Sequence, residues 1–457
     1  MSEETQRPLV VAANRLPVSR GPFGWAPSPG GLVRALMPLL RASGGMWVGW
    51  TGDADDAPEP FELDGVQLHP IGISAEEVED YYEGFSNDTL WPLYHDALRD
   101  STYDFRHWEA YHSVNQRFAD MLAAVAPQGA VVWIHDYHLQ LVPQMLRAQR
   151  SDVQIGFFFH IPFPPYELFM RLPWRTEIAA GLAACDLVGF QRSINAANFV
   201  AAAEELLGVV PHVGSYPISI DVEEIEAIAA GRATRQLSNR YRTRLGEPEV
   251  VLLGVDRLDY TKGISQRLRA YQSLLDDGTL GTERCVMVQV ATPTREGVEH
   301  YRNERAEIEQ LVGEINGVHG RLGYPALHYL YQSLPFEDLV ALYRTGDVML
   351  VTPLRDGMNL VAKEFVTTRL DGDGVLVLSE FAGAADELTD AVLVNPHDEK
   401  ALREAIVTAV EMHRHERRAR LARLREVVKG SDVRGWAERF LADLDASPNQ
   451  STSESRP

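Results

Sequence analysis

Short runs that are apolar on both faces, separated by stretches with helical spacing, constrain this chain more than any other feature. One series of runs lies at residues 8–13, 130–135, 154–160 and 186–190, and a second lies at 249–255, 285–291, 347–352, 374–379 and 391–395. A strand without a polar face must be covered on both sides, which is typical of a parallel sheet between two layers of helices. Amphipathic stretches at 30–43, 115–126, 138–149 and 166–182 supply such helices in the first series. The pattern predicts an α/β fold with two Rossmann-like, doubly wound parallel-sheet domains.

The boundary between the two domains is expected near residues 216–222, where a proline and an Asp-started helix separate the two series. We therefore predict an N-terminal domain at 1–217 and a second domain at 218–432. The stretch at 433–446 is expected to be a helix that packs back on the first domain. Residues 447–457, which are rich in Ser and other polar types, are expected to form a disordered tail.

Lys and Arg number 43 and Asp and Glu number 65, so the formal net charge is −22. Such a chain repels nucleic acids and anionic membranes, and an anionic ligand requires a local group of cations. The N-terminus has no signal-like pattern and no apolar run approaches about 18 residues, so a cytoplasmic protein without a membrane partner is expected. Cys185 and Cys285 lie in apolar runs and are expected to be buried free thiols. Composition leaves monomer and homo-oligomer open.

Ligands of open parallel sheets bind beyond the carboxyl ends of the strands, so the residues that follow each run are the candidates. Arg15 follows the first run. Gly30 and Gly31 precede the next helix, where their backbone N–H groups can approach a phosphate or simply form a turn. The loop IHDYHL places Asp136 after another run, either in a metal site or as a carboxylate that accepts hydrogen bonds from sugar hydroxyls. His160 ends the following run, as a ligand contact or as a core histidine.

The second series carries a denser group of polar residues. Arg257 and Lys262 flank a turn after a strand and suit a diphosphate, or they form ordinary ion pairs with nearby aspartates. Arg295 adds a third cation after the next strand. The segment TPLRDGMNLVAKE directs the backbone N–H groups of 357–360 toward the same edge, with carboxylates at Asp356 and Glu364.

Other motifs have simpler interpretations. Trp47, Trp50, Tyr82 and Trp91 can stack on sugar rings or fill the core. The D-x-D strings at 53–55 and 371–373 are interpreted as turns, and the absence of GxxxxGK[ST] excludes a P-loop phosphotransferase. The polar stretch at 231–245 is expected to be a solvated helix. The Arg-rich stretch at 411–429 is interpreted as a helix with a solvated face and apolar positions Leu421, Leu424 and Val427, with an anion-binding arm as its alternative.

Taken in order, the motifs identify a family. ANRLPVS, GGL, WVGWTG, YYEGFSNDTLWPLYH, IHDYHL, FFHIPFP, DRLDYTKG and TPLRDGMNLVAKEF resemble the α,α-trehalose-6-phosphate synthases, over about residues 8 to 445. The resemblance implies retaining glycosyltransferases of the GT-B fold, whose two Rossmann-like domains face each other across a cleft. It implies transfer of glucose from a nucleoside-diphosphate glucose to glucose 6-phosphate by a same-face substitution, with no metal and no other cofactor.

The resemblance also implies roles for single residues. Acceptor contacts would be Arg15, Trp47, Tyr82, Trp91, Asp136 and Arg295, with the two arginines on the 6-phosphate. Donor contacts would be Gly31, His160, Arg257, Lys262, Asp356, Gly357, Met358, Asn359, Leu360 and Glu364. The candidate catalytic residues among these are Asp136, His160, Arg257, Lys262 and Asp356.

The chain departs from the family pattern in two places. The stretch at 191–216 is shorter than in many members. Leu334 and Phe336 stand where a bacterial base-pocket pattern has an aromatic residue and an arginine, so uridine, guanosine and adenosine donors stay open. The alternatives to trehalose 6-phosphate synthesis are a glucosylglycerol-phosphate synthase, a cyclitol-joining pseudo-glycosyltransferase and a non-catalytic subunit that senses sugar phosphates.

Overall fold

The computed structural model describes residues 7–21, 24–28, 31–97 and 102–447. Its internal contacts divide the chain into two compact units. Unit 1 comprises Met1–Pro217 and Arg434–Pro457, and unit 2 comprises Ile218–Val433. Gly30 and most of the expected tail, residues 448–457, lie outside the described residues.

Unit 1 is built on an eight-stranded sheet in the order β10-β9-β8-β7-β1-β4-β6-β5. All neighbouring strands are parallel except β5 and β6, which form an antiparallel pair at one edge. A separate hairpin follows β1. The strands are β1 (Leu9–Arg15), β2 (Val18–Gly21), β3 (Gly24–Pro27), β4 (Met46–Trp50), β5 (Phe61–Leu63), β6 (Val66–Ile71), β7 (Val131–His135), β8 (Gln154–Phe158), β9 (Leu187–Phe190) and β10 (Val213–Ser215).

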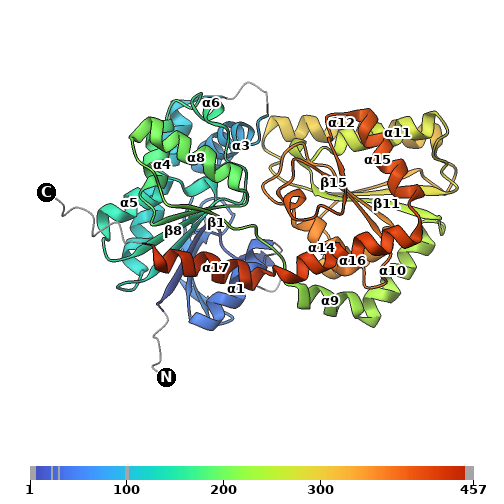
Figure 1. Cartoon of the computed structure of the whole chain (residues 1–457). Helices are drawn as coiled ribbons and strands as arrows, with labels where there is room; N and C mark the ends of the chain where they lie inside the picture. The colour runs from blue at the N-terminus through green and yellow to red at the C-terminus, as the bar shows by residue number, and fades with distance from the viewer. Residues whose placement is uncertain (1–6, 22–23, 29–30, 98–101, 448–457) are drawn as a thin grey trace. The chain divides into compact units, whose positions relative to one another are not determined.

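Helices cover both faces of this sheet, and Figure 1 shows α1 and α17 across it from α4 and α8. The helices are α1 (Gly31–Ser43), α2 (Ala75–Glu77), the π-helix η1 (Val78–Leu90), α3 (Trp91–Tyr94), α4 (Phe105–Val125), the 3₁₀ turn η2 (Tyr137–Leu139), α5 (Val142–Gln149), α6 (Tyr166–Phe169), α7 (Arg175–Ala183), α8 (Ser193–Leu207) and α17 (Val433–Ala446).

The last helix, α17, packs on the first sheet although it is the last element of the chain. Its Trp436 and Phe440 are fully buried, and their rings lie 5.1 Å and 4.6 Å from that of Trp133 in β7. The sheet makes room for it with glycine, because a Cβ at Gly189 would lie 2.7 Å from the Phe440 ring. The helix therefore completes the core of unit 1.

Unit 2 is built on a six-stranded, wholly parallel sheet in the order β13-β12-β11-β14-β15-β16. Its strands are β11 (Val250–Arg257), β12 (Cys285–Thr292), β13 (Leu327–Tyr331), β14 (Val348–Val351), β15 (Val375–Ser379) and β16 (Val392–Val394). Its helices are α9 (Val222–Ala230), α10 (Arg232–Arg244), η3 (Tyr260–Lys262), α11 (Ile264–Asp276), α12 (Glu299–His319), α13 (Phe336–Thr345), α14 (Leu360–Thr368), η4 (Gly383–Asp386), α15 (Glu399–Glu411) and α16 (Arg414–Gly430).

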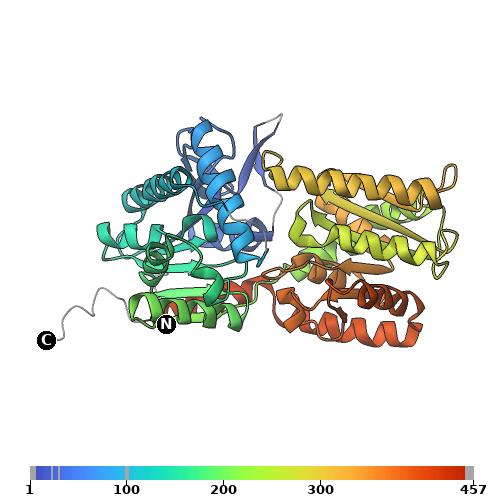
Figure 2. The same cartoon turned by 90° about the horizontal axis from the view of Figure 1, so that it is seen from above.

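The helices of unit 2 form two layers on its sheet. In Figure 1, α11, α12 and α15 lie on one face and α9, α10, α14 and α16 on the other. Figure 2 shows α11 and α12 running side by side along the first of these layers. The two doubly wound parallel sheets confirm the predicted fold class.

Some local predictions are wrong. The helices predicted at 138–149 and 166–182 are each broken into two elements, and prolines at positions 143 and 173 lie near the breaks. β4, β6 and β13 were not predicted, because Gly, His, Pro and Tyr interrupt their apolar runs. In α16, Val428 is buried and Val427 is exposed, one position away from the predicted stripe.

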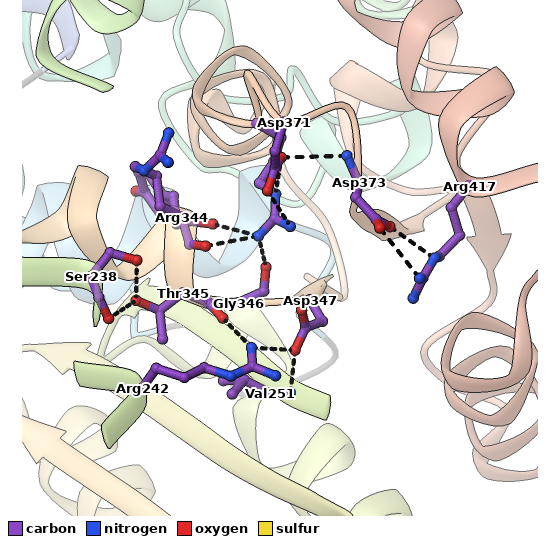
Figure 3. Close-up of polar contacts among 12 residues, drawn as sticks. Ser238, Arg242, Val251, Arg344, Thr345, Gly346, Asp347, Asp371, Asp373 and Arg417 are labelled. Carbon is purple, nitrogen blue, oxygen red and sulfur yellow. Dashed lines mark hydrogen bonds and ion pairs between the residues drawn. The ribbon is translucent and has the colours of Figure 1, made fainter. Parts of the chain in front are cut away.

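The helix predicted at 231–245 exists as α10, but it is not simply solvated. Ser238 is buried with its hydroxyl 3.0 Å from that of Thr345, and the Arg242 guanidinium donates to the Thr345 carbonyl and to Asp347 at 2.7 Å (Figure 3). Asp347 also accepts from the Val251 backbone at 2.8 Å, so α10 is joined to the start of two strands.

The predictions for the cysteines and for the D-x-D strings are confirmed. Cys185 and Cys285 are buried thiols. The D-x-D strings lie in turns, where Asp55 has a φ of 58°. Among the residues that the structure describes, none of the helices combines the length and apolar character that crossing a bilayer requires.

Candidate functional site

The candidate residues follow the strands at which each sheet reverses its order. In unit 1, β1 pairs with β4 on one side and β7 on the other, and in unit 2, β11 lies between β12 and β14. At such a reversal the helices leave on opposite faces and open a crevice beyond the carboxyl ends of the strands. Arg15 and Asp136 lie at the reversal in unit 1, and Arg257 and Asp356 lie at the one in unit 2.

Arg15 ends β1 with an exposed side chain held over two aromatic rings. Its guanidinium carbon lies 4.1 Å from the centre of the Trp50 ring and 5.3 Å from that of Tyr82. Gly52, with a φ of 106°, leaves space for it, because a Cβ there would lie 1.7 Å from the guanidinium. Among the described residues no carboxylate pairs with Arg15. A fixed guanidinium without a counter-ion suits an anionic ligand.

The aromatic candidates form the surroundings of Arg15. Trp47 is buried in β4, and its indole N–H donates to the Arg15 carbonyl at 3.0 Å. Tyr82 lies in η1 and stacks on His138, with ring centres 6.0 Å apart. Trp91 follows η1 and is 3% exposed, against Tyr137. A π-helix is rare and often marks a functional site, and here it positions Tyr82.

Asp136 and His160 lie together, and His135 joins them. Asp136 has a strained φ of 74°, and its carboxylate accepts a hydrogen bond from the His160 backbone N–H at 3.2 Å. The His135 Nδ1 lies 3.1 Å from the His160 Nε2. Burial lowers the pKa of His160 to about 3, and burial together with the proximity of His160 lowers the pKa of His135 well below its usual value. Both imidazoles are therefore neutral near pH 7.

Three cations of unit 2 converge on one buried carboxylate, Asp259. Arg295 donates to it at 3.2 Å, and the Arg295 side chain is only 4% exposed. Burial alone raises the pKa of Asp259, but Arg295, Arg257 and Lys262 outweigh that effect and hold it below the usual value. Asp259 is therefore ionised near pH 7, with three cations close to it.

Lys262 connects this group to the loop after β14. Its ammonium donates to Asp356 at 2.6 Å, and the amide of Asn359 donates to the same oxygen at 3.2 Å. Asn359 has a φ of 89° and caps α14 by accepting from the Ala362 N–H at 3.2 Å. Gly357 and Met358 are buried beside the turn of η4, where the Ala384 N–H donates to the Met358 carbonyl at 2.9 Å.

Glu364 lies one turn into α14 and accepts from the Tyr343 hydroxyl at 2.9 Å. Gly31 is the first residue of α1 and, like His160, belongs to unit 1. The other predicted donor contacts belong to unit 2. The described residues contain no group of three or more His, Cys, Asp or Glu side chains able to hold a metal.

Two supporting residues were not among the predicted site residues. Arg267 is fully buried in α11, where it donates to Asp256 at 2.7 Å and to the Lys262 carbonyl at 3.0 Å. Its signal is an arginine at an apolar position of an amphipathic helix, between Ile264 and Leu268. The second residue is His135, which the sequence offered only as the first member of the H-D-x-H string at 135–138, the alternative metal site.

Known proteins match this chain over nearly its whole length. The model of glycosyltransferase family 20 matches residues 5–446. A trehalose-6-phosphate synthase of Mycolicibacterium gilvum (strain PYR-GCK) is 52% identical over 468 residues, which cover 95% of this chain and 93% of the relative.

Two solved structures with ligands are similar throughout. A structure from E. coli bound with UDP-2-fluoro glucose is 35% identical with a TM-score of 0.87, and the match covers 97% of this chain and 99% of that one. A UDP-forming α,α-trehalose-phosphate synthase from Burkholderia xenovorans, in complex with glucose 6-phosphate, is 34% identical with a TM-score of 0.88, over 96% of this chain and 100% of that one. On this agreement in sequence and structure, the chain belongs to glycosyltransferase family 20.

Proposed function

We propose that this chain transfers glucose from a nucleoside-diphosphate glucose to glucose 6-phosphate with retention, which gives α,α-trehalose 6-phosphate and a nucleoside diphosphate. The observation that carries this function is the placement of cations in a chain of net charge −22. Among the described residues of unit 1 no carboxylate pairs with Arg15, and in unit 2 Arg257, Lys262 and Arg295 gather near Asp259, with Lys262 also bonded to Asp356. Both substrates carry phosphate groups, and each needs such local positive charge.

The donor is held by unit 2 together with Gly31 and His160. Arg257 and Lys262 bind its diphosphate, and Glu364 accepts from the ribose hydroxyls. Asp356 and the backbone of 357–360 bind the glucose that is transferred. The strained φ of Asn359 and its cap on α14 support this, because they fix the loop before any ligand arrives.

The acceptor is held by its 6-phosphate, which pairs with Arg15 and Arg295, and by its ring. Tyr82 and Asp136 contact the sugar, while Trp47 and Trp91 support the site from the core. The strongest support is the geometry of Arg15, whose guanidinium is fixed over Trp50 and Tyr82. A guanidinium fixed in this way loses little conformational freedom when it binds phosphate.

The chemistry is a same-face substitution with an ion-pair-like transition state. The glucose–phosphate bond breaks as the anomeric hydroxyl of the acceptor attacks from the same face, and the leaving phosphate takes the proton of that hydroxyl. Arg257 and Lys262 stabilise the negative charge that grows on the phosphate. These two cations supply the charge compensation, and no metal is part of the proposal.

The test is release of nucleoside diphosphate from uridine, guanosine and adenosine diphosphate glucose, measured in parallel with and without glucose 6-phosphate. We expect release from at least one donor only with glucose 6-phosphate present, and a product with two α-anomeric centres by NMR. Glycerol 3-phosphate and a cyclitol serve as competing acceptors in separate arms, and a chelator arm tests the need for a metal. Preferred use of a competing acceptor, or no release from any donor, would overturn the proposal.

A further inference from the structure

Two histidines, His135 and His160, lie against each other beside Asp136. The His135 Nδ1 and the His160 Nε2 are 3.1 Å apart, and their rings are stacked with centres 5.3 Å apart. His135 is fully buried, whereas His160 keeps a partly exposed edge. Of the two rings, only that of His160 is therefore accessible to a ligand.

The surroundings of the pair are aromatic. The ring of Trp133 lies 4.8 Å from that of His135, and the rings of Phe158 and Trp436 lie 4.9 Å and 6.3 Å from that of His160. The backbone N–H of His160 is already bonded to Asp136. In such an apolar environment a charged imidazole is disfavoured, so both rings carry one proton each.

One proton lies in the bond between the two rings, and it can belong to either ring. If His160 donates it from Nε2, the remaining proton of His135 must sit on Nε2. That atom is buried and has no hydrogen-bond partner in the described part of the chain. A buried N–H without an acceptor is rarer and costlier than an unfilled acceptor lone pair. If His135 instead donates from Nδ1, its Nε2 carries no proton, and only the lone pair of that nitrogen lacks a partner.

We propose that His135 is a positioning residue that fixes the tautomer of His160. His135 donates its Nδ1–H to the Nε2 of His160, so His160 must carry its own proton on Nδ1 and present it as a hydrogen-bond donor. This inference rests on the proposed function in one respect, namely that His160 contacts the glucose that is transferred. The ligand atom facing His160 is then an oxygen that accepts a hydrogen bond, such as a hydroxyl oxygen of the hexose.

The tautomer is directly measurable in the ligand-free enzyme by multiple-bond ¹H–¹⁵N correlation spectra of the histidine-labelled protein. The His135→Phe and His160→Phe variants assign the two rings among the 14 histidines. We expect both rings to have a protonated Nδ1 and a bare Nε2. A protonated Nε2 on His160, or averaged tautomers, would overturn the proposal. Because the measurement needs no turnover, it can succeed or fail independently of the proposed function.

Binding measurements then test whether the tautomer matters for the sugar. In His135→Phe we expect affinity for the nucleoside-diphosphate glucose to fall about tenfold, as for one lost hydrogen bond, while affinity for the nucleoside diphosphate alone stays within about twofold. His135→Asn keeps a donor near Nδ1 and should recover most of the loss.

The matched control is Trp133→Phe, which alters the same aromatic surroundings without removing the bond between the histidines. It should change the unfolding temperature but not the ratio of the two affinities. An equal loss for both ligands in His135→Phe, or a similar change of the ratio in Trp133→Phe, would reduce His135 to a core residue and contradict the positioning role.

Discussion

At the scale of single residues, buried ion pairs hold the candidate cations in place before any substrate binds. Lys262 is bonded to Asp356 at 2.6 Å and is only 8% exposed, and Arg295 is bonded to the buried Asp259. A pair of this kind costs desolvation, and each member depends on the other. The pairs keep the cations fixed near the place where phosphate charge is expected to grow.

The first prediction concerns Lys262→Ala. Loss of a cation that stabilises the leaving phosphate should raise the barrier by about 2–4 kcal/mol, which lowers kcat by roughly 30-fold to 1,000-fold. The chain should still fold, because Asn359 continues to donate to Asp356. Lys400→Ala is the matched control, since the Lys400 side chain is 84% exposed. Near-normal kcat in Lys262→Ala would contradict the diphosphate role.

The second prediction is a pH dependence of stability from the histidine pair. The folded-state pKa values of His135 and His160 lie below the unfolded value of about 6.5. Below that pH the unfolded chain binds protons that the folded chain does not, so stability is complete above pH 6.5 and falls as the pH drops. As the pH falls below 6.5, each histidine should lower the free energy of unfolding by up to about 1.4 kcal/mol per pH unit.

The check is urea unfolding of wild type and His135→Phe between pH 7.5 and 5.5. Other groups titrate in both proteins. The difference between the two plots of unfolding free energy against pH therefore gives the contribution of His135. The wild type should lose more stability than the variant over this range. Equal slopes would mean that His135 takes up a proton in the folded protein.

At the scale of elements, the contact between α17 and the first sheet sets which residues β8 and β9 can carry. A Cβ at Gly156 would lie 2.9 Å from Phe440 and from Leu444. We predict that Gly156→Ala destabilises unit 1 by about 1–3 kcal/mol through overpacking. Phe440→Leu in the same chain should recover part of this loss, and a double-mutant cycle from urea unfolding measures the coupling. Strictly additive effects would show that α17 does not press on β8.

Arginines of the helix α16 contact residues at the ends of other elements. Arg425 donates to the Val366 and Thr367 carbonyls at the end of α14, at 3.2 Å and 2.7 Å, and Arg417 pairs with Asp373 at 2.9 Å (Figure 3). Cations at helix C-termini satisfy free carbonyls and oppose the helix dipole. This favours the interpretation of 411–429 as a structural helix over an anion-binding arm.

Elements and sites differ in how far the sequence predicts them. A run such as 285–291 predicts a strand because it is apolar throughout, as expected for a strand buried on both faces. β4 carries Trp47 and Trp50 beside a glycine, and only its neighbours β1 and β6 show that it is a central strand. The placement of Arg15 follows from the end of β1, but the convergence of Arg257, Lys262 and Arg295 on Asp259 joins two loops, one after β11 and one after β12. Contacts across loops leave no periodic pattern in the sequence.

At the scale of the whole molecule, unit 1 needs both ends of the chain and unit 2 needs one continuous segment. Trp436, Phe440 and Leu444 of α17 are fully buried. Removing their burial costs about 1.5–3 kcal/mol each, which together is comparable to the whole stability of a domain. We predict that a chain ending at residue 433 keeps a folded unit 2 but loses a stable unit 1.

Limited proteolysis and calorimetry of the shortened chain check this prediction. Early cleavage should fall within 7–217, while a fragment near 218–433 persists. A chain ending at residue 447, which retains α17, is the control and should unfold like the full-length protein. Equal protease resistance of unit 1 in both chains would contradict the prediction.

The return of α17 to unit 1 has a consequence for the order of events during synthesis. Domains usually fold in the order in which the ribosome releases them. Here unit 2 is complete once Val433 has emerged, whereas the aromatic face of β7 and β8 waits for Trp436 and Phe440. The part made first is therefore finished last, and until the final turns leave the ribosome its exposed rings are a target for chaperones and a risk for aggregation.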